Sequence, residues 1–472
     1  MKIVRFGFVV AVALMAIVGL STQSYAFHDG GVAYCEGCHT MHESINNAVV
    51  TIANGTSSVQ ITPVGTSQFN NASQYLLKGS DGSSTCLNCH RVADTSPSSY
   101  HIMSTAAGGA AFNTNTGIPI ERTPGGDFAW LTINGSGQAA TKGKHNGHNI
   151  VANDYGLTSS TNYGAASPGG AYGSGTGYPV NNLQCNSCHD PHSAARQLNG
   201  VVSYRTSGQS GAPIEASGSY NTSSTTKTVG VYRFLGGKNY KPLSSGTFAG
   251  FQADPPFAIA PSTYNQTEAT NQVRVAYGSG MSEWCANCHY SILNNQGAGT
   301  GTTHVHPAGS AALLSQGEGA LYDAYVKSGD MSGTGANAYT SLVPFEMGLP
   351  RSNGAAMTTL ETYAVNDGSK AAGVADATAQ GGTPNVMCLS CHRAHASAFP
   401  FMTRFGATGG EFITGSDNAY AGYDSTDPDG SNSRINYGYN QAQMSAAYYD
   451  RPAATNFSAN QRVLCNKCHA KD

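Results

Sequence analysis

The sequence predicts a mostly irregular coil with a few short α-helices and very little β-structure. Only 11% of its residues are charged, against about 25% in ordinary proteins. Glycine occupies 58 of the 472 positions. The long stretches 104–120, 133–147, 156–182 and 206–230 are rich in Gly, Ser, Thr and Asn and lack the apolar periodicity of a helix or a strand. Such a chain buries little apolar surface, so something other than its side chains must supply the core.

The N-terminal segment, residues 1–26, is predicted to be a secretory signal peptide that is removed. Lys2 and Arg5 precede an apolar run, and Ser24-Tyr25-Ala26 places small residues before a cleavage point. A membrane anchor is the alternative, but the run is short for spanning a bilayer. No later stretch is long and apolar enough to cross a membrane. We therefore expect an exported protein with one domain over residues 27–472 and no transmembrane segment.

Short helices are expected in a few places only. They are predicted after the cysteine motifs, at about 311–327, where apolar residues recur, and at about 440–449. The rest is expected to be turns and loops, without a clear domain boundary.

The formal net charge is -3, so the chain has no basic balance to favour nucleic acid as a partner. The scarcity of charge has two interpretations. Composition favours a loop-rich fold with a neutral, hydrogen-bonding surface. The alternative is that much of the surface is buried in an assembly, because charge keeps proteins apart.

All twelve cysteines fall into six copies of one pattern, C-x-x-C-H. This is the attachment motif of c-type haem: the two thiols bond one haem and the adjacent histidine binds its iron. The predicted covalent attachment residues are Cys35, Cys38, Cys86, Cys89, Cys185, Cys188, Cys285, Cys288, Cys388, Cys391, Cys465 and Cys468. The predicted proximal iron ligands are His39, His90, His189, His289, His392 and His469.

Other uses of paired cysteines explain this pattern less well. A zinc site does not require a histidine directly after the second cysteine, and six redox dithiols in one chain would be unusual. Disulfides suit an exported protein but do not favour this spacing in every case. We therefore predict six c-type haems, whose large apolar rings form the missing core. The chain is expected to wrap around six closely stacked covalent haems.

Nine further histidines are available for the second axial position of six irons, so bis-histidine coordination throughout is possible. His42, His192 and His395 each follow a proximal histidine by three residues. On a short helix the two would share a face, so the second cannot reach its own motif's iron and is a candidate ligand for a neighbouring haem. A surface position beside a haem propionate is the alternative. His28, His101, His148 and His306 complete the candidate distal ligands, with His145 and His304 as lower-ranked members of the two histidine clusters.

Several longer motifs resemble one known family along essentially the whole of residues 27–472. They include FHDGGVAYCEGCHTMH from Phe27, TPGGDFAW ending at Trp130, GHNIVANDYG from Gly147, RVAYGSGMSEWCANCH ending at His289 and CLSCHRAHAS from Cys388. The chain is thereby similar to the OmcS-type hexahaem outer-surface c-type cytochromes of metal-reducing bacteria, which polymerise into extracellular conductive filaments. The loops at 53–80, 156–180 and 350–383 match least well.

The resemblance implies further properties. It implies bis-histidine haems stacked along a continuous line, in a chain with little regular structure. It also implies that His42 crosses to the adjacent subunit and ligates the haem held there by Cys388, Cys391 and His392. The matching segments contain seven candidate distal ligands for six places, so one of them is expected to have another role.

The predicted function is extracellular long-range electron transfer, without catalysis, by subunits that polymerise into a filament. The partners implied are copies of the same chain, other multihaem cytochromes and extracellular electron acceptors such as metal oxides. Haem attachment is expected in the periplasm and the final location at the outer cell surface. One alternative is a soluble monomeric periplasmic electron carrier. Another, less favoured because every motif ends in histidine and leaves no open iron position, is a multihaem reductase.

Overall fold

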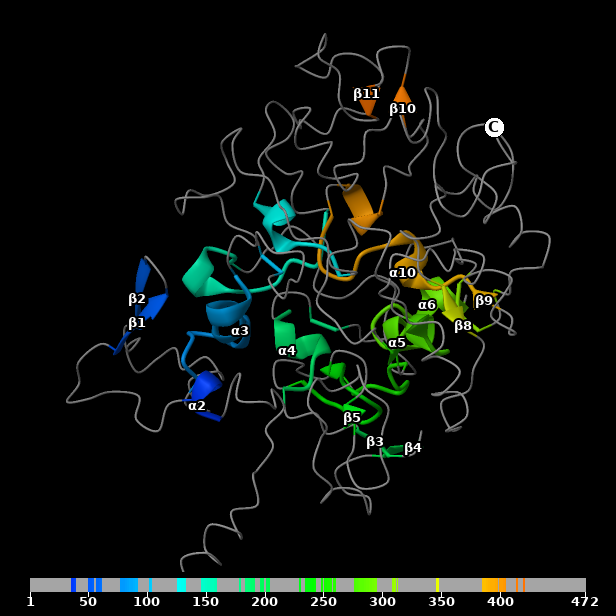
Figure 1. Cartoon of the computed structure of the whole chain (residues 1–472), viewed down its shortest axis with the longest axis horizontal. Coiled ribbons are helices and arrows are strands. Elements are labelled where there is room, and N and C mark those ends of the chain that lie inside the picture. The colour runs from blue at the N-terminus through cyan, green and yellow to red at the C-terminus, as the bar shows by residue number, and fades with distance from the viewer. Residues whose placement is uncertain are drawn as a thin grey trace, which may run out of the picture.

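In the described residues, the computed structural model consists of short helices, most of them a single turn, with short strands and irregular segments between them (Figure 1). It describes residues 35–39, 50–54, 57–61, 77–91, 102–103, 125–132, 146–158, 178–179, 183–191, 196–198, 201–203, 229–230, 234–242, 248, 250–256, 258–259, 276–294, 308–310, 312, 345–347, 384–397, 399–404, 413–414 and 419–420. The α-helices are α2 (Cys35–Cys38), α3 (Gly82–His90), α4 (Cys185–Cys188), α5 (Met281–Cys285), α6 (Tyr290–Asn294) and α10 (Cys388–Cys391). Three 3-10 turns are η2 (Phe128–Leu131), η4 (Asn153–Tyr155) and η10 (Pro400–Met402).

The strands are short and belong to four small sheets. Two are hairpins, β1 (Val50–Asn54) with β2 (Ser57–Ile61) and β10 (Ile413–Thr414) with β11 (Ala419–Tyr420). A third sheet has the order β4 (Val201–Ser203), β3 (Arg196–Leu198), β5 (Val229–Gly230). The fourth has the order β6 (Ala258–Ile259), β7 (Ala276–Tyr277), β8 (Glu346–Met347), β9 (Pro384–Asn385). The predicted irregular coil with short helices and very little β-structure is confirmed.

Most of the described helices do not follow a cysteine motif, as the sequence pattern predicts, but lie within one. Within the described residues, most begin at or before the first cysteine of a motif and end inside it, and only α6 follows one. The helix expected at about 311–327 lies outside the described residues apart from Ala312, and the one expected at 440–449 lies wholly outside them. The predicted signal peptide, residues 1–26, is also outside them. Among the residues described, no helix has the length and apolar character needed to cross a bilayer.

Serine side chains explain why two motifs form a single helical turn. The hydroxyl of Ser187 accepts the backbone N–H of Gln184 at 2.9 Å, directly before α4. The hydroxyl of Ser390 likewise accepts the N–H of Met387 at 3.1 Å, directly before α10. Each serine therefore satisfies an N–H that would otherwise have no partner at the start of the helix.

Aromatic and sulfur-containing side chains form two small clusters beneath these turns. One consists of Leu235, Tyr277, Met281, Met387 and Leu389, with Trp284 and Cys285 packed against it. The other is Tyr178, Phe248 and Phe251, with Leu183, Tyr240, Trp284 and Cys288 at its edge. Trp284 contacts both clusters, so the packing continues from one cysteine motif to the next. Neither cluster has the size of an ordinary domain core, as the composition predicts.

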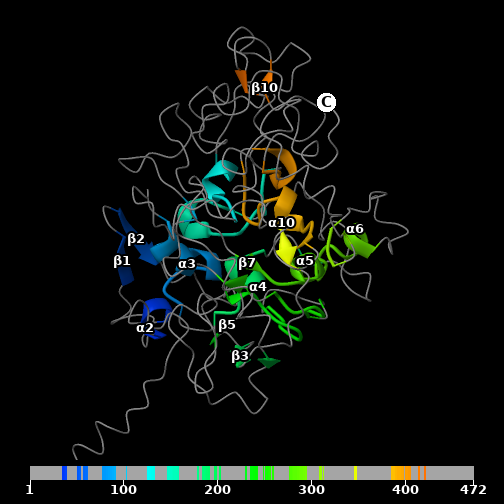
Figure 2. The ribbon, with the colours of Figure 1, turned by 45° about the vertical axis from the view of Figure 1, so that its right-hand side comes forward.

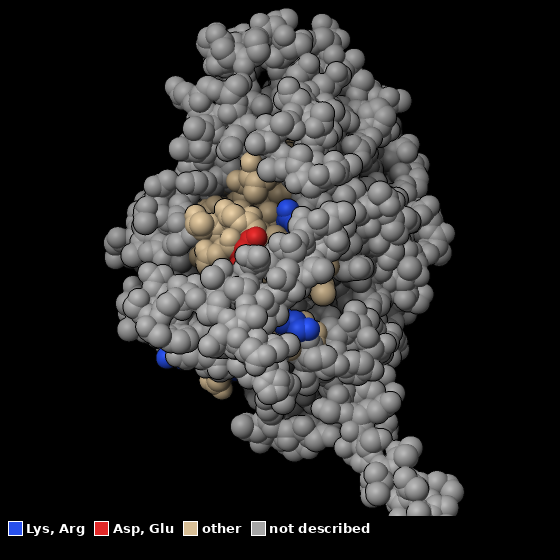
Figure 3. Space-filling view, turned by 90° about the vertical axis from the view of Figure 1, so that its left-hand side faces the viewer, with Lys and Arg blue, Asp and Glu red and all other residues tan. Residues whose placement is uncertain are grey.

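Charged side chains are sparse on the surface that the structure describes. The face in Figure 3 shows a mostly uncharged described region, with small acidic and basic patches. This agrees with a sequence in which charged residues make up 11%.

Candidate haem-binding centres

Five of the six cysteine motifs include described residues, and the structure gives three of them the same local geometry. In each, the N–H of the motif histidine donates to the carbonyl of the first cysteine: His189 to Cys185 at 3.0 Å, His289 to Cys285 at 3.1 Å and His392 to Cys388 at 2.8 Å. One turn of helix therefore holds both thiols and brings the histidine beside them. The sixth motif, Cys465, Cys468 and His469, and the side chain of Cys35 lie outside the described residues.

The second and third motifs form a pair in which α3 packs on α4 (Figure 1). The hydroxyl of Ser83, three residues before Cys86, accepts the N–H of Cys185 at 3.0 Å. The thiols of Cys86 and Cys185 hydrogen-bond to each other, and this contact raises the pKa of Cys86 and lowers that of Cys185. Burial raises the pKa of Cys188 to about 12. The pair thus places partly buried sulfur atoms of two motifs side by side.

The fourth and fifth motifs repeat this arrangement, with α5 packed on α10 (Figure 2). The hydroxyl of Ser282, again three residues before the first cysteine, accepts the N–H of Cys388 at 3.1 Å. The thiols of Cys285 and Cys388 hydrogen-bond to each other, which raises the pKa of Cys285 and lowers that of Cys388. Motifs two to five are therefore two equivalent pairs.

Contacts between the pairs arrange the motifs in sequence order. The N–H of Lys78 donates to the carbonyl of Cys38 at 2.9 Å, so the first motif adjoins the segment before α3. Between the third and fourth motifs, the indole of Trp284 donates to the carbonyl of Gly236 at 2.8 Å. The N–H of Gly236 in turn donates to the carbonyl of Cys188 at 2.8 Å. The first five motifs consequently follow one another as a chain of neighbours in space.

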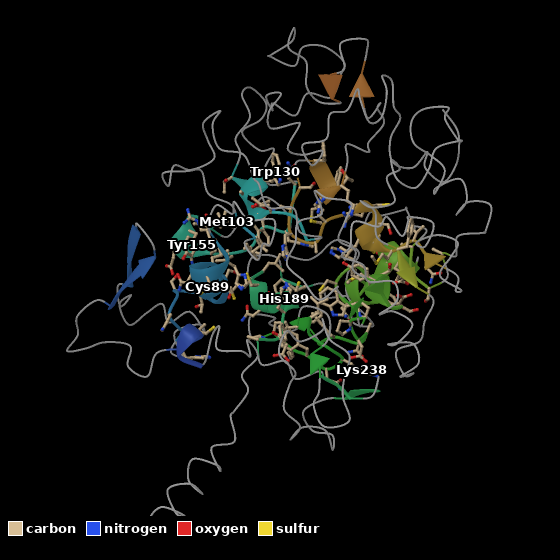
Figure 4. All side chains as sticks on the ribbon, viewed as in Figure 1. Cys89, Met103, Trp130, Tyr155, His189 and Lys238 are labelled. Carbon is tan, nitrogen blue, oxygen red and sulfur yellow. The ribbon has the colours of Figure 1, made fainter. Side chains whose placement is uncertain are left out.

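Three of the helical turns end in extended backbone that presents the motif histidine. His39 pairs with Leu77, His189 with Leu235 and His392 with Thr403 in isolated antiparallel bridges. The side-chain Nδ1 of His392 lies 2.7 Å from the carbonyl oxygen of Phe401, which leaves Nε2 for a metal. Figure 4 places His189 next to α4, in the interior of the described region.

Two candidate distal histidines face motif histidines at a specific separation. The ring centroids of His148 and His289 are 6.0 Å apart, with an interplanar angle of 33°. Those of His189 and His395 are 6.2 Å apart, with an angle of 57°. Two imidazoles bound to opposite sides of one metal, with bonds of about 2 Å, have centroids about 6 Å apart. Both pairs fit the two axial positions of one iron.

His148 and His395 are held by one structure, which we call the distal-histidine clamp: residues 125–127, 146–148 and 394–397. The N–H of His395 donates to the carbonyl of Gly125 at 2.6 Å, and the N–H of His148 donates to the carbonyl of His395 at 2.9 Å. The ring of His395 stacks on Phe128 with centroids 4.7 Å apart. Three short segments, held together by backbone hydrogen bonds, thus position the candidate distal ligands of two different motifs.

The protonation of His148 suits a metal ligand. Its Nδ1 lies 2.6 Å from the carbonyl oxygen of Ala394 and therefore carries the proton. Desolvation lowers the pKa of His148, and the bond to Ala394 opposes this shift. A neutral imidazole whose Nδ1–H donates to a carbonyl has its Nε2 lone pair available for a metal.

These observations agree with haem rather than with a metal ion held by protein alone. Among the described residues, no group of three or more His, Cys, Asp or Glu side chains is placed to hold a metal ion. The donors are instead two histidines on opposite sides, beside a pair of thiols, which is the set that a covalently attached haem requires. The residues present therefore fit the predicted cofactor.

The remaining candidate ligands, His28, His42, His101, His145, His192, His304 and His306, lie outside the described residues. One prediction from spacing is wrong: His395 does not share a helix face with His392. The helix ends at Cys391, and His392 is extended, with φ -117° and ψ 159°. The roles of Ser83 and Ser282 were not predicted from the sequence. Their signal was a serine three residues before the first cysteine, present only in motifs two and four.

Comparison with known proteins identifies the family. The chain is 46% identical over 472 residues to the c-type cytochrome OmcS of Geobacter sulfurreducens, covering 98% of each sequence. The chain belongs to the OmcS family of c-type cytochromes. Membership confirms the predicted family and the c-type haem cofactor.

Solved structures of OmcS support the same assignment. The chain superposes on the outer membrane cytochrome S filament from Geobacter sulfurreducens with a TM-score of 0.71 and 44% identity, over 94% of this chain and all of the other. A cryo-electron microscopy structure of the OmcS nanowires of that organism gives the same TM-score and coverage at 43% identity. No family model matches the chain.

Proposed function

We propose that this OmcS-family chain is an extracellular electron conduit. Its subunits polymerise into a filament and pass electrons along six c-type haems to external acceptors such as metal oxides. The proposed mature protein is residues 27–472, one hexahaem domain, after removal of residues 1–26. The observation that carries this function is the sequence-ordered row of neighbouring motifs, two of which pair a motif histidine with a second histidine at 6.0 and 6.2 Å.

In this proposal the cysteines of the six motifs attach the haems and the motif histidines are the proximal ligands. His148 is the distal ligand of the fourth haem, opposite His289. His395 is the distal ligand of the third haem, opposite His189. Each haem supplies one-electron iron chemistry. The protein keeps the rings close and, by filling both axial positions, leaves no open site for a substrate, so we expect electron transfer without catalysis.

The row of motifs also favours a conduit over the alternatives. Among the described residues, motifs one to five succeed one another as neighbours, which supports passage of electrons from motif to motif. A reductase would need one iron with a missing ligand. OmcS, at 46% identity, forms filaments, and the proposed conduit extends that assembly to this chain.

The His42→Ala variant tests the assembly. We propose that His42 ligates the fifth haem of the adjacent subunit, opposite His392, so its loss should abolish filaments while leaving all six haems attached. The measurement is electron microscopy of material sheared from cells, with haem content determined from the same preparation. His145→Ala is the control, since His145 ranks below His148 as a candidate distal ligand.

Filaments that persist in His42→Ala would remove His42 from the interface but leave the conduit intact. Soluble hexahaem subunits from the wild type, with no filaments under any condition, would favour the monomeric carrier.

A further inference from the structure

Glu346 is a buried acid that electron transfer through axial ligands does not use. Its side chain is fully buried, at 0% exposure. It lies on β8, where its backbone pairs with Tyr277 of β7 and with Asn385 of β9. Strand β7 leads into α5 with the fourth motif, and β9 leads into α10 with the fifth. The carboxyl group is therefore built into the junction of two haem-attachment turns.

The contacts of this carboxyl group are asymmetric. Oε2 accepts two backbone N–H groups at the start of α5, from Gly280 at 3.1 Å and Met281 at 3.0 Å. Oε1 is buried and has no hydrogen-bond partner among the described residues. A buried carboxylate oxygen without a donor is costly, and a proton on that oxygen lowers the cost because it removes the charge. The site thus has one anchored oxygen and one that is suited to take up a proton.

A second acid, Glu283 on α5, lies close to Glu346. Its Oε1 accepts the N–H and the hydroxyl of Ser310 at 2.8 and 2.5 Å. Its Oε2 is buried and, like Oε1 of Glu346, has no hydrogen-bond partner in the described part of the chain. Because Ser310 is exposed, Glu283 connects this buried acidic pair to solvent. Both acids also lie near Cys388, where they oppose the lowering of its thiol pKa by the hydrogen bond with Cys285.

We propose that Glu346 is a proton-binding site coupled to electron transfer through the haems of the fourth and fifth motifs. The inference rests on the proposed function, because it requires those haems. With the haems attached, one proton from water would bind Oε1 of Glu346 for each electron that this junction gains. When the electron moves on, the proton returns to water. Charge balances within the junction in both steps.

The pKa of Glu346 supports this role. It is raised to about 7, first by burial and then by the nearby Glu283 carboxyl, while the N–H groups at the start of α5 and the side chain of Asn385 oppose the shift. Reduction removes one positive charge from the junction, so it raises the pKa of the acid. The haem potential should therefore be high when Glu346 is protonated and fall as pH rises through the region around neutrality. The described titratable groups that interact with the acid are Glu283 and the cysteine at 388, which is a thioether once haem is attached.

The test is a potentiometric titration of the intact hexahaem protein at a series of pH values, with Glu346→Gln beside the wild type. Gln keeps the oxygen that accepts from Gly280 and Met281 but cannot be charged. If reduction strengthens proton binding tenfold, the affected potential drops by about 59 mV between the acid and alkaline limits. We expect this pH-dependent drop in haem potential in the wild type and expect it to be absent in Glu346→Gln. Haem propionates titrate in both proteins, so the difference between them is the measure.

A second variant and a second readout sharpen the test. Glu283→Gln should keep the pH-dependent component but move it to lower pH, because the repelling carboxylate is gone. Redox difference infrared spectra should show a protonated-carboxyl band that appears on reduction, shifts in D₂O and is absent in Glu346→Gln.

Identical pH profiles in the wild type and Glu346→Gln, at full haem content, would overturn the proton site while leaving the conduit unaffected. Missing haems or absent filaments in the wild type would instead count against the proposed function.

Discussion

The His395→Ala variant should keep six covalently bound haems and convert one of them to a five-coordinate, ligand-binding state. The reason is the position of His395, whose ring is 6.2 Å from that of His189 and thus opposite it across the third haem. Alanine leaves no other described imidazole at that site. The measurement is carbon monoxide binding to the fully reduced protein. We expect one site per chain in the variant and none in the wild type, with a matching high-spin signal.

Three further variants make this result specific. His148→Ala should open the fourth haem in the same way, and the double variant should bind two carbon monoxide molecules. His395→Met retains an axial ligand, so it should bind none and should raise the potential of one haem. His145→Ala is the negative control. A His395→Ala protein with full haem content and no carbon monoxide site would contradict the proposed ligand pair.

The Gly126→Ala variant should disrupt the distal-histidine clamp. Gly126 has φ +81°, in the left-handed region, and a Cβ there would overlap the carbonyl oxygen of Ala396 and lie 2.8 Å from Cδ of Arg393. That carbonyl accepts the N–H of Asp127 at 3.1 Å, so the segment carrying His395 must move. We expect a loss of about 2–4 kcal/mol in the free energy of unfolding, measured by chemical denaturation. A partial carbon monoxide site at the third haem should accompany it.

Gly156→Ala separates backbone strain from this clash. Gly156 also has a positive φ, +76°, but a Cβ there meets nothing within 4 Å. Gly156→Ala should lower the free energy of unfolding by about 1 kcal/mol, the cost of the left-handed conformation alone. It should leave all axial ligands in place. Equal losses of stability in the two variants would show that backbone strain, rather than the overlap with the carbonyl oxygen of Ala396, accounts for the effect of Gly126→Ala.

Much of this protein can be predicted from its amino-acid sequence. The irregular fold follows from a composition that is poor in charge and in periodic apolar residues. The cofactor follows from the C-x-x-C-H motifs, and the family follows from the longer motifs around them. His148 was preferred over His145, and the structure places His148 opposite His289. The predicted shared helix face for His392 and His395 was wrong, because the turn ends at Cys391 and the chain then extends.

Other features depend on contacts that sequence spacing does not reveal. The hydroxyl of Ser83 meets the N–H of Cys185 across a separation of 102 residues. The hydroxyl of Ser282 meets the N–H of Cys388 across 106. A serine three residues before a cysteine is an ordinary local pattern, and only the packing of α3 on α4 and of α5 on α10 gives it a role. Glu346, likewise, becomes a buried acid only when three strands meet.

The sequence by itself determined the cofactor, its attachment points and the family, because covalent haem attachment depends on residues within one turn of the chain. The tertiary structure decided which motifs are neighbours and which histidine faces which: His148 with His289, and His395 with His189. Axial pairing is a long-range contact between imidazoles from distant segments. In a chain with few regular elements, no periodicity records such contacts, and only the folded backbone brings the two rings to opposite sides of one site.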